Sequence, residues 1–468
     1  MKPYYWLTAT LLIAITSCGK VSEKPDEETT DNTFLVTPTG TLGTPADIAS
    51  NADNVYITGS TYGPAGTTVN FGDVSLRLGG GSDAFIARYD RKGVAIWAKI
   101  LGGLSDEWGY ATAVDKSGNV YVAGSFNNTA VIDGITLTAK LIDTHLGRNQ
   151  FDMFLVKYDK DGNQLWLKQV SGAGYERPVG IAIDNNGKIL VTGYFDSSIA
   201  FETTGTTTTA GPAFFITSFN ADGSLNWNKI QGEGKNGTIQ PKSIKVTSKG
   251  NIIVYGAFSG TKKLGTTMYT SGDSDIFLMK LNAQGDITWE RTFGWSTTEA
   301  NGLAVDDDES TYLAGDYKSM LKIGNITLSG DNVRNGFLAS YDKDGIVLWA
   351  NKINDDAAQT TESALDLSCY NNKIYLSGFY GGKLTLGNTT LTTMGGVLQG
   401  FIVAYNPDGS VVQAQNLASR SVIPSKFQID NSGNAALYGT FSGTFTLDNK
   451  DYTPLGNNTV FLAVYKAE

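Results

Sequence analysis

The sequence repeats one ten-residue pattern, and this repetition constrains the fold more than any other feature. KYDKDGNQLW occupies residues 157–166, and similar segments begin at residues 88, 218, 280, 340 and 404. A truncated copy, VYKAE, begins at residue 464, so successive copies start 60 to 69 residues apart. Repetition at such a period indicates stacked copies of one supersecondary unit.

Each unit contains four predicted strands, which we call a to d. In the second copy they are residues 111–115, 117–126, 151–159 and 163–170, which are rich in Tyr, Val, Phe and Trp and are bounded by Gly, Asp or Asn. A single four-stranded sheet cannot bury both of its faces without neighbours. The repeat therefore predicts a β-propeller, in which each sheet is one blade.

The ten-residue pattern itself is predicted to be a turn followed by an inter-blade wedge. Asp159 and Gly162 occupy the first and last corners of a type I turn, and Trp166 follows on strand d. The equivalent tryptophans are Trp97, Trp227, Trp289 and Trp349, and the sixth copy has Gln413 instead. A calcium loop would need further oxygen ligands, and RYDRKG and KLNAQG lack even the second carboxylate, so we predict no metal here.

Counting the copies predicts seven blades and the way in which the ring closes. The copies begin at Ala46, Glu107, Glu176, Gln240, Glu299, Glu362 and Ser425, and the seventh ends without its own strand d. FLVTPTG (34–40) stands where WAKILGG (97–103) stands in the first copy. We therefore expect residues 33–38 to supply the outer strand of the last blade, which would remove an open sheet edge.

The whole unit resembles the bacterial seven-bladed propeller repeats, called SBBP repeats, that are found in secreted proteins. The matching segments are AVDKSGNVYVAG (113–124) and FDMFLVKYDKDGNQLW (151–166), and the match recurs across nearly all of residues 46–468. A more distant resemblance is to the tryptophan-bearing repeats of quinoprotein-like propellers, including an outer-membrane assembly lipoprotein. The resemblance implies the fold, whereas members of the repeat family mostly lack an assigned activity.

The N-terminus is predicted to be a targeting segment. Lys2 precedes an apolar run from residue 4 to 15, which is short for a membrane span. Residues 15–18 (ITSC) resemble the bacterial lipobox, which implies cleavage and a lipid such as palmitate on Cys18. An ordinary secretory signal with a chance cysteine is the alternative. Residues 19–32 are polar and acidic and are predicted to be a flexible tether to a propeller spanning 33–468.

The composition and the predicted cellular location limit the kinds of molecule that could be partners. In the lipoprotein families that the N-terminus resembles, Gly19 after the cysteine permits passage to the outer membrane, so we expect a lipid-anchored protein of the bacterial cell envelope. A formal net charge of −10 argues against nucleic acid as a partner. Besides Cys18 the chain has only Cys369, so no intrachain disulfide is predicted, and we interpret Cys369 as a half-buried strand-end residue.

The candidate binding face is the one that carries the d-to-a and b-to-c connections, because these are longer and more varied than the other turns. Its most distinctive elements are the insert 140–150, which holds the single histidine His145, and the loops bearing Trp108, Tyr175, Arg177 and Trp295. Glu107, Glu176, Glu299 and Glu362 are expected near the mouth of the central channel. They could form an acidic rim for a cation or a cationic or polyhydroxyl ligand, or each could accept backbone N–H bonds from the adjoining loop.

Motifs for catalysis are scarce. The sequence has no P-loop, no G-x-G-x-x-G opening a helix and no nucleophile elbow around His145, and a single histidine without a cysteine pair excludes histidine-based zinc sites. No cofactor is predicted. We expect a non-catalytic binding or scaffold module that engages an envelope protein or a glycan, and a carbohydrate-active enzyme using two rim carboxylates is the alternative.

Overall fold

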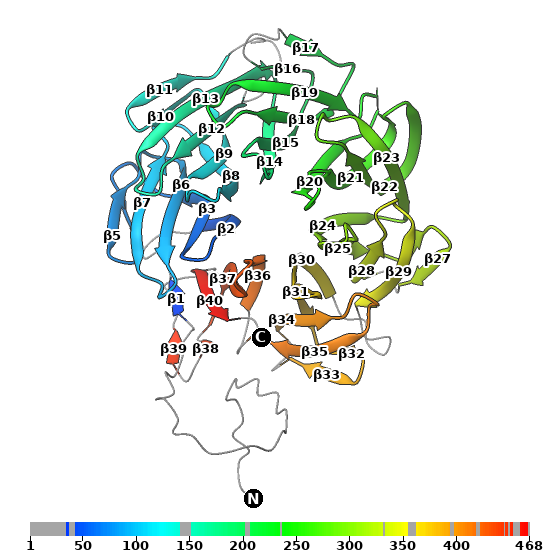
Figure 1. Cartoon of the computed structure of the whole chain (residues 1–468). Coiled ribbons are helices and arrows are strands. Elements are labelled where there is room, and N and C mark those ends of the chain that lie inside the picture. The colour runs from blue at the N-terminus through cyan, green and yellow to red at the C-terminus, as the bar shows by residue number, and fades with distance from the viewer. Residues whose placement is uncertain are drawn as a thin grey trace, which may run out of the picture.

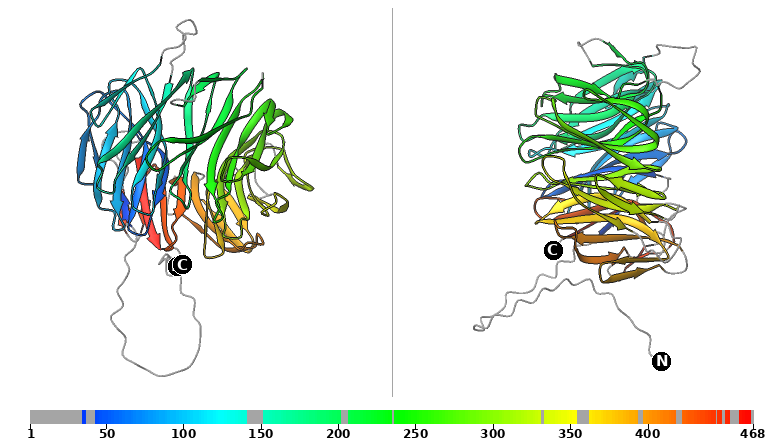
Figure 2. Two further views of the ribbon diagram at one scale, coloured as in Figure 1. Left: turned by 45° about the horizontal axis from the view of Figure 1, so that its top comes forward. Right: turned by 90° about the vertical axis from the view of Figure 1, so that its right-hand side faces the viewer.

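The structure is a computed structural model that describes most of residues 34–466. The described residues are 34–36, 43–140, 151–201, 206–234, 236–330, 333–353, 362–393, 397–417, 422–443, 445–447, 450–452 and 459–466. Within these ranges the chain forms β-strands joined by turns and loops, and no helix. The strands form a closed ring of seven four-stranded antiparallel blades around a central axis (Figure 1). Seen from the side, this ring is a short cylinder (Figure 2).

The blades follow one another in chain order. Blade 1 contains β2 (Gly43–Ser50), β3 (Asn54–Tyr62), β6 (Ser82–Asp90) and β7 (Ala95–Leu101). Blade 2 contains β8 (Glu107–Val114), β9 (Val120–Asn127), β12 (Phe151–Tyr158) and β13 (Gln164–Ala173). Blade 3 contains β14 (Glu176–Ile183), β15 (Ile189–Phe195), β18 (Ala213–Phe219) and β19 (Leu225–Gln231). Blade 4 contains β20 (Ile239–Val246), β21 (Ile252–Leu264), β22 (Thr267–Leu281) and β23 (Ile287–Trp295). Blade 5 contains β24 (Thr298–Val305), β25 (Thr311–Tyr317), β28 (Asn335–Tyr341) and β29 (Val347–Ile353). Blade 6 contains β30 (Glu362–Tyr370), β31 (Lys373–Gly381), β34 (Leu398–Tyr405) and β35 (Val411–Asn416).

Blade 7 confirms the predicted closure. Its strands are β36 (Val422–Ile429), β37 (Asn434–Phe441), β40 (Thr459–Lys466) and the N-terminal β1 (Phe34–Val36). β1 pairs antiparallel with β40, with Phe34 opposite Val464 and Val36 opposite Leu462 (Figure 1). The two ends of the described chain thus complete one sheet, which gives the last blade its outer strand.

The b-to-c connections differ from the expectation of varied loops. Every blade carries a β-hairpin there, made by β4–β5 (Thr68–Phe71, Val74–Arg77), β10–β11 (Thr129–Ile132, Ile135–Thr138), β16–β17 (Ser198–Ala200, Thr206–Thr208), β26–β27 (Met320–Ile323, Ile326–Ser329), β32–β33 (Lys383–Leu386, Thr389–Thr392), β38–β39 (Phe445–Leu447, Lys450–Tyr452) and, in blade 4, the extended ends of β21 and β22. In two places the hairpin also pairs with the outer strand of the preceding blade, as β16 does with β13. These connections are therefore mainly scaffold.

The hydrophobic core is divided into seven clusters, one between each pair of adjacent blades. For example, one cluster joins Tyr56 of blade 1 to Val122 and Phe154 of blade 2, and another joins Val55 of blade 1 to Leu462 of blade 7. Strands b and c are almost fully buried, because each middle strand has a neighbouring blade on both faces. The free energy of burial is therefore gained at the interfaces, as the stacking argument requires.

A phenylalanine of strand c occupies the same position in every blade. The ring of Phe154 lies over Gly124 on strand b, where a Cβ atom would stand 2.3 Å from Phe154 Cζ. The same Gly and Phe pairing recurs in all seven blades, for instance between Gly439 and Phe461. The repeated glycine is thus required by close packing inside the blade.

The KYDKDG turn serves the contact between blades. Asp159 Oδ1 accepts hydrogen bonds from the backbone N–H groups of Asp161 and Asn163, and Gly162 has φ +83°. Trp97 of the preceding blade donates its indole N–H to the carbonyl oxygen of Lys160 at 3.0 Å, and its ring lies 3.1 Å from where a Gly162 Cβ would be. Trp166, Trp227, Trp289 and Trp349 make the same donation to the next blade, at 3.2, 3.3, 3.1 and 2.8 Å.

Candidate functional site

Seven inner strands, β2, β8, β14, β20, β24, β30 and β36, surround the axis, and each contacts the next (Figure 1). Each contains a β-bulge at the same register position, for example between Gly109 and Ala111 in β8. Bulges redirect side chains, and they are frequent where a strand borders a functional site. The residues just before and within each bulge lie at the end of the inner strand that adjoins the d-to-a connection.

We call the second residue before each bulged residue the entrance ring, because the seven are equivalent in register. Its members are Thr44, Trp108, Arg177, Gln240, Glu299, Ser363 and Ile423. The ring thus presents seven different side chains on one repeated backbone. It unites three of the residues singled out from the sequence, Trp108, Arg177 and Glu299, at equivalent places on three different blades.

Between blades 2 and 3 the ring belongs to a cluster of aromatic residues and one arginine. The Arg177 guanidinium lies 4.1 Å from the ring centroid of Tyr110, and its Nη1 donates to Tyr194 Oη at 3.5 Å. Phe151 contacts Trp108 and Tyr175 edge to face, with centroids 5.1 and 4.8 Å apart. Phe151 is buried, whereas the other members are half-buried. Tyr110 and Tyr194 were not identified from the sequence, although Tyr110 is only two residues from Trp108.

Three of the four glutamates lie away from the surface. Glu107, Glu176 and Glu362 occupy the residue before the entrance ring and are 0% exposed. Glu107 Oε2 accepts the backbone N–H of Gly103 at 2.9 Å, as the loop-holding interpretation expects. Because none of the three side chains reaches solvent, they do not form an open acidic rim.

Each of the first two glutamates is buried near an aspartate of the preceding blade. Asp83, which is also 0% exposed, approaches Glu107 around Gly102, where a Cβ would stand 2.2 Å from Asp83 Oδ1 and 2.7 Å from Glu107 Oε2. Burial, with the negative charge of Asp83, raises the pKa of Glu107 to about 9. Burial, with the charge of Asp152, likewise raises the pKa of Glu176 to about 9. Both glutamates are therefore protonated at neutral pH.

Glu299 is the exposed member of the four. It forms an ion pair with Arg334 at 3.2 Å and lines a cavity of about 270 Å³ between blades 4 and 5 together with Gln240, Lys242 and Asn301. A glycosidase needs two accessible carboxyl groups on either side of the scissile bond. The four glutamates do not provide such a pair.

Below the entrance ring lies a set of charged residues that sequence reasoning missed. Lys426 stands between Asp47 and Asp366; burial alone would lower its pKa, but these two negative charges raise it. Asp47 Oδ2 accepts the N–H of Thr112 at 2.9 Å, and Asp366 Oδ2 accepts that of Phe427 at 3.0 Å, so each aspartate also ties its blade to the next. The residue type at this position next to the bulge differs from blade to blade, and this variation was the signal available in the sequence.

The remaining candidates are dispersed. Trp295 ends β23 at the outer side of blade 4, is 66% exposed, and has Lys322 Nζ 6.0 Å from its ring centroid. Cys369 is partly buried on β30, and burial raises the pKa of its thiol. Cys18, the tether 19–32 and His145, with the rest of the insert from residue 141, lie outside the described residues.

The described ranges contain neither a cluster of metal-ligating side chains nor a helix that could cross a membrane. No three His, Cys, Asp or Glu side chains gather there as a metal site would require. No helix long and apolar enough to cross a membrane occurs in the same part of the chain.

Comparisons with known proteins support the repeat architecture. The chain is similar to an uncharacterised WD repeat-containing protein of Acanthamoeba polyphaga mimivirus, with 22% identity over 445 residues that cover 79% of this chain and 32% of that protein. It is also similar to the regulatory protein FlaEY of Caulobacter vibrioides, with 23% identity over 438 residues that cover 88% and 44%. The chain thus corresponds to less than half the length of the curated relatives it matches. No protein-family model matches the sequence.

Among solved structures, the β-propeller domain of the Trilobed protease from Pyrococcus furiosus aligns with 90% of this chain and 93% of that chain, at 9% identity and a TM-score of 0.43. This match concerns the fold. The seven blades themselves establish the propeller, and a WD repeat-containing protein is among its relatives, whereas the finer likeness to SBBP repeats of lipoproteins stays a resemblance. Propellers of this kind commonly present a binding face, and the fold alone indicates no more specific role.

Proposed function

We propose that the protein is a non-catalytic interaction module that binds a protein partner through the entrance ring at blades 2 and 3. The observation that carries the proposal is the cluster of Trp108, Tyr110, Tyr175, Arg177 and Tyr194 at the d-to-a face. Trp, Tyr and Arg are the residues that supply most of the binding free energy at protein interfaces. Half-buried rings offer large contact areas and have few rotamers to lose on binding.

The cluster is also held in place before any partner arrives. The Arg177 guanidinium stacks on the Tyr110 ring and donates a hydrogen bond to the Tyr194 hydroxyl, so two neighbours fix its orientation. Phe151 begins β12 directly after the insert and donates its backbone N–H to the carbonyl of Gly174 at 3.1 Å. Preorganisation of this kind reduces the entropy lost on association.

We further propose that a lipid on Cys18 anchors the module to the bacterial cell envelope, most simply the outer membrane. The support is the lipobox-like ITSC segment and the polar stretch 19–32 that follows it. Labelling cells with an alkyne analogue of palmitate should mark the wild-type protein and leave Cys18→Ser unlabelled. Equal labelling of both proteins would refute the anchor.

The binding proposal is tested by cross-linked affinity purification of the full-length protein from its native membrane. The Trp108→Ala/Arg177→Ala variant should lose a specific partner, because removing two central anchors usually weakens an interface by more than a hundredfold. The control is Trp295→Ala, which removes a more exposed tryptophan from the outer side of blade 4, outside the cluster, and should retain the partner. If both variants retained the partner, this function would be refuted. It would also be refuted if the wild type captured one glycan reproducibly and no protein.

A further inference from the structure

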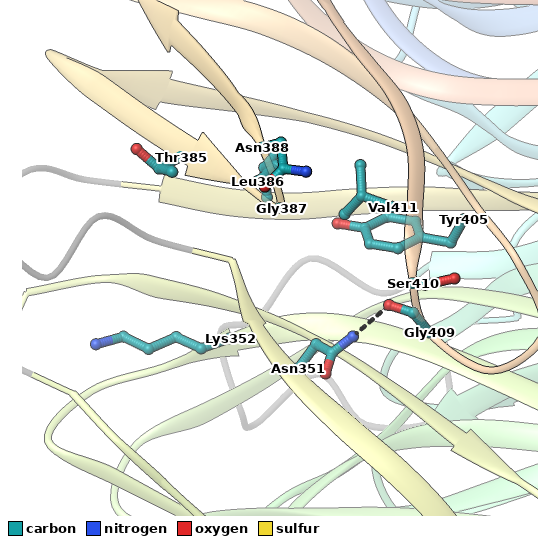
Figure 3. Close-up of a pocket in the computed structure, with 10 residues that line it drawn as sticks. All are labelled: Asn351, Lys352, Thr385, Leu386, Gly387, Asn388, Tyr405, Gly409, Ser410 and Val411. Carbon is teal, nitrogen blue, oxygen red and sulfur yellow. Dashed lines mark hydrogen bonds between the residues drawn. The ribbon is translucent and has the colours of Figure 1, made fainter.

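A second cavity lies on the outer edge of the ring, away from the entrance ring. Its volume is about 490 Å³, and it opens between β29 of blade 5 and the β32–β33 hairpin of blade 6. Asn351 and Lys352 come from β29, Thr385 and Leu386 from β32, and Tyr405 and Ser410 from the end of β34 and the turn after it (Figure 3). All of its lining residues belong to the described chain.

The cavity contains a buried hydroxyl group that has no partner. Tyr405 is 1% exposed, and its Oη makes no hydrogen bond to any described residue. Figure 3 shows this oxygen directed into the space between Leu386 and Asn351. Burial raises the pKa of Tyr405, so the group stays protonated and can both donate and accept. A buried polar group without a partner is costly and needs an explanation.

Comparison with the other blades shows why a cavity exists at this interface. Between blades 1 and 2 the equivalent residues are Lys99, Asp133 and Tyr158. There the Lys99 ammonium pairs with Asp133 at 2.6 Å and lies 5.2 Å from the Tyr158 ring centroid. Between blades 5 and 6, Asn351 stands in place of the lysine, and Gly387 stands in place of the aspartate, as glycine does at this hairpin corner in blades 1, 4 and 5. Tyr405 is retained and, like Tyr158, has no hydrogen-bond partner for its hydroxyl, but here the space in front of the hydroxyl is open.

Two other interfaces also have a long cation at the position of Asn351, although its partner there lies in the c-to-d turn. Between blades 3 and 4, Lys229 pairs with Asp286 at 3.0 Å, and between blades 4 and 5, Arg291 Nε donates to the carbonyl of Gly345 at 2.8 Å. Asn351 Nδ2 donates to the carbonyl of Gly409 at 2.8 Å, and this shorter side chain lines the cavity (Figure 3). At this position the short side chain of Asn351 replaces a long cationic side chain, and the space that the longer chain would fill is the cavity.

We propose that this cavity binds a neutral polyhydroxyl ligand the size of a mono- or disaccharide. Its volume falls within the range of small-molecule sites. Neutral hydroxyl and amide groups from Tyr405, Asn351 and Thr385 supply both donors and acceptors, as sugar hydroxyls require. Leu386 and the Tyr405 ring provide apolar surface. No carboxylate lines the cavity to attract a cation, and its single cation, Lys352, already interacts with another residue.

The test measures binding of D-glucose, D-galactose, N-acetyl-D-glucosamine and cellobiose to the full-length protein by saturation-transfer NMR and calorimetry. At least one sugar should bind. Asn351→Lys should weaken that binding at least tenfold, because the longer side chain fills the cavity as Lys99 fills its counterpart. Tyr405→Phe should weaken it about five- to tenfold through loss of one hydrogen bond.

Both variants are expected to fold, because Lys229 and Phe219 already occupy the equivalent positions in other blades. Tyr158→Phe is the matched control, since it removes the same hydroxyl at a filled interface, and it should leave sugar binding unchanged. Absence of binding for all four sugars would overturn the proposal, as would equal binding by the wild type and Asn351→Lys. Trp108→Ala/Arg177→Ala should retain sugar binding, which separates this site from the entrance ring.

Discussion

Replacing Glu107 and Glu176 by glutamine should stabilise the protein at alkaline pH, opposite to the effect expected if either carboxylate were a salt-bridge partner. Both side chains are fully buried, and burial beside Asp83 and Asp152 raises each pKa from 4.5 to about 9. In the unfolded chain these groups ionise near their ordinary pKa. The stabilising contribution of each folded-state proton is therefore complete below about pH 4.5 and is lost as the pH rises toward 9.

The magnitude follows from proton linkage. Between these two pKa values the folded chain holds one proton more per glutamate than the unfolded chain, so the free energy of unfolding falls by about 1.4 kcal/mol per pH unit for each group. For two glutamates, raising the pH from 6.5 to 8.0 should remove about 4 kcal/mol. This slope is insensitive to the folded pKa as long as that pKa stays above the measured range. Glutamine keeps the size and the hydrogen-bonding capacity but cannot ionise, so this part of the pH dependence should disappear.

The assay is urea unfolding followed by tryptophan fluorescence at pH 6.5, 7.0, 7.5 and 8.0. The wild type and the Glu107→Gln/Glu176→Gln variant should diverge steadily as the pH rises, with the variant the more stable. Glu299→Gln is the control: this exposed glutamate should leave the slope of the wild type unchanged. Parallel pH profiles for the wild type and the double variant would show that the buried carboxyl groups are ionised in the folded protein and would refute the reasoning.

Two further predictions concern the blade contacts. Gly223→Ala should lower the free energy of unfolding by more than about 2 kcal/mol, because Gly223 has φ +85° and a Cβ would meet the Trp166 ring at 3.1 Å, whereas Gly187→Ala, with φ +76° but open space around it, should lose only about 1 kcal/mol; equal losses in urea titrations would contradict the stacking of Trp166 on the turn. Deleting residues 33–38 should lower the melting temperature sharply, because blade 7 would lose β1 and expose the edge of β40; an unchanged calorimetric melt would contradict closure by β1.

The blade architecture could be predicted because each unit repeats the same local signals. The same features recur in register: the alternating or continuous apolar residues of strands b and c, the Asp and Gly corners of the c-to-d turn, and the tryptophan of strand d. Because the copies agree, the strands could be predicted even where a single copy would be ambiguous. The likeness of residues 34–40 to the strand d of the first copy predicted the outer strand of blade 7, and β1 pairs with β40 as expected.

The hairpins in the b-to-c connections were missed although a local signal was present. Asp133 and Gly134 form a two-residue turn with φ +46° and +82°, which is the geometry expected for an Asp-Gly hairpin. Other blades use Gly-Asn or Gly-Thr at this place, for example Gly387 and Asn388. The b-to-c connections therefore look unrelated when their residue types are compared, and their equivalence is visible only in the backbone conformation.

The sequence left open whether the four glutamates form an acidic rim or hold the adjoining loops, because spacings counted from the a-to-b turns, which differ in length, do not give the register of the inner strands. In blade 6 this turn is a two-residue loop, Asn371 and Asn372, both with positive φ. Register places Glu362 level with Glu107, and it places Glu299 level with Trp108, one residue further along. On a strand, one residue reverses the side on which the side chain lies. A one-residue error thus separates a buried glutamate from an exposed one.

Departures from the repeat, rather than the repeat itself, identify the two places where this protein is expected to bind other molecules. A residue that every blade shares, such as the glycine beneath Phe154, is explained by packing within each blade and carries no information about a ligand. The entrance ring holds seven different side chains on one backbone position, so the packing shared by all blades does not determine the residue type there. At the outer edge, the interface between blades 5 and 6 has an asparagine where the interface between blades 1 and 2 has a lysine paired with an aspartate. The Tyr405 hydroxyl, which lacks a partner as Tyr158 does, therefore faces a cavity. Packing alone would favour the filled version found between blades 1 and 2, so the open version is explained best by a ligand that completes the missing hydrogen bonds.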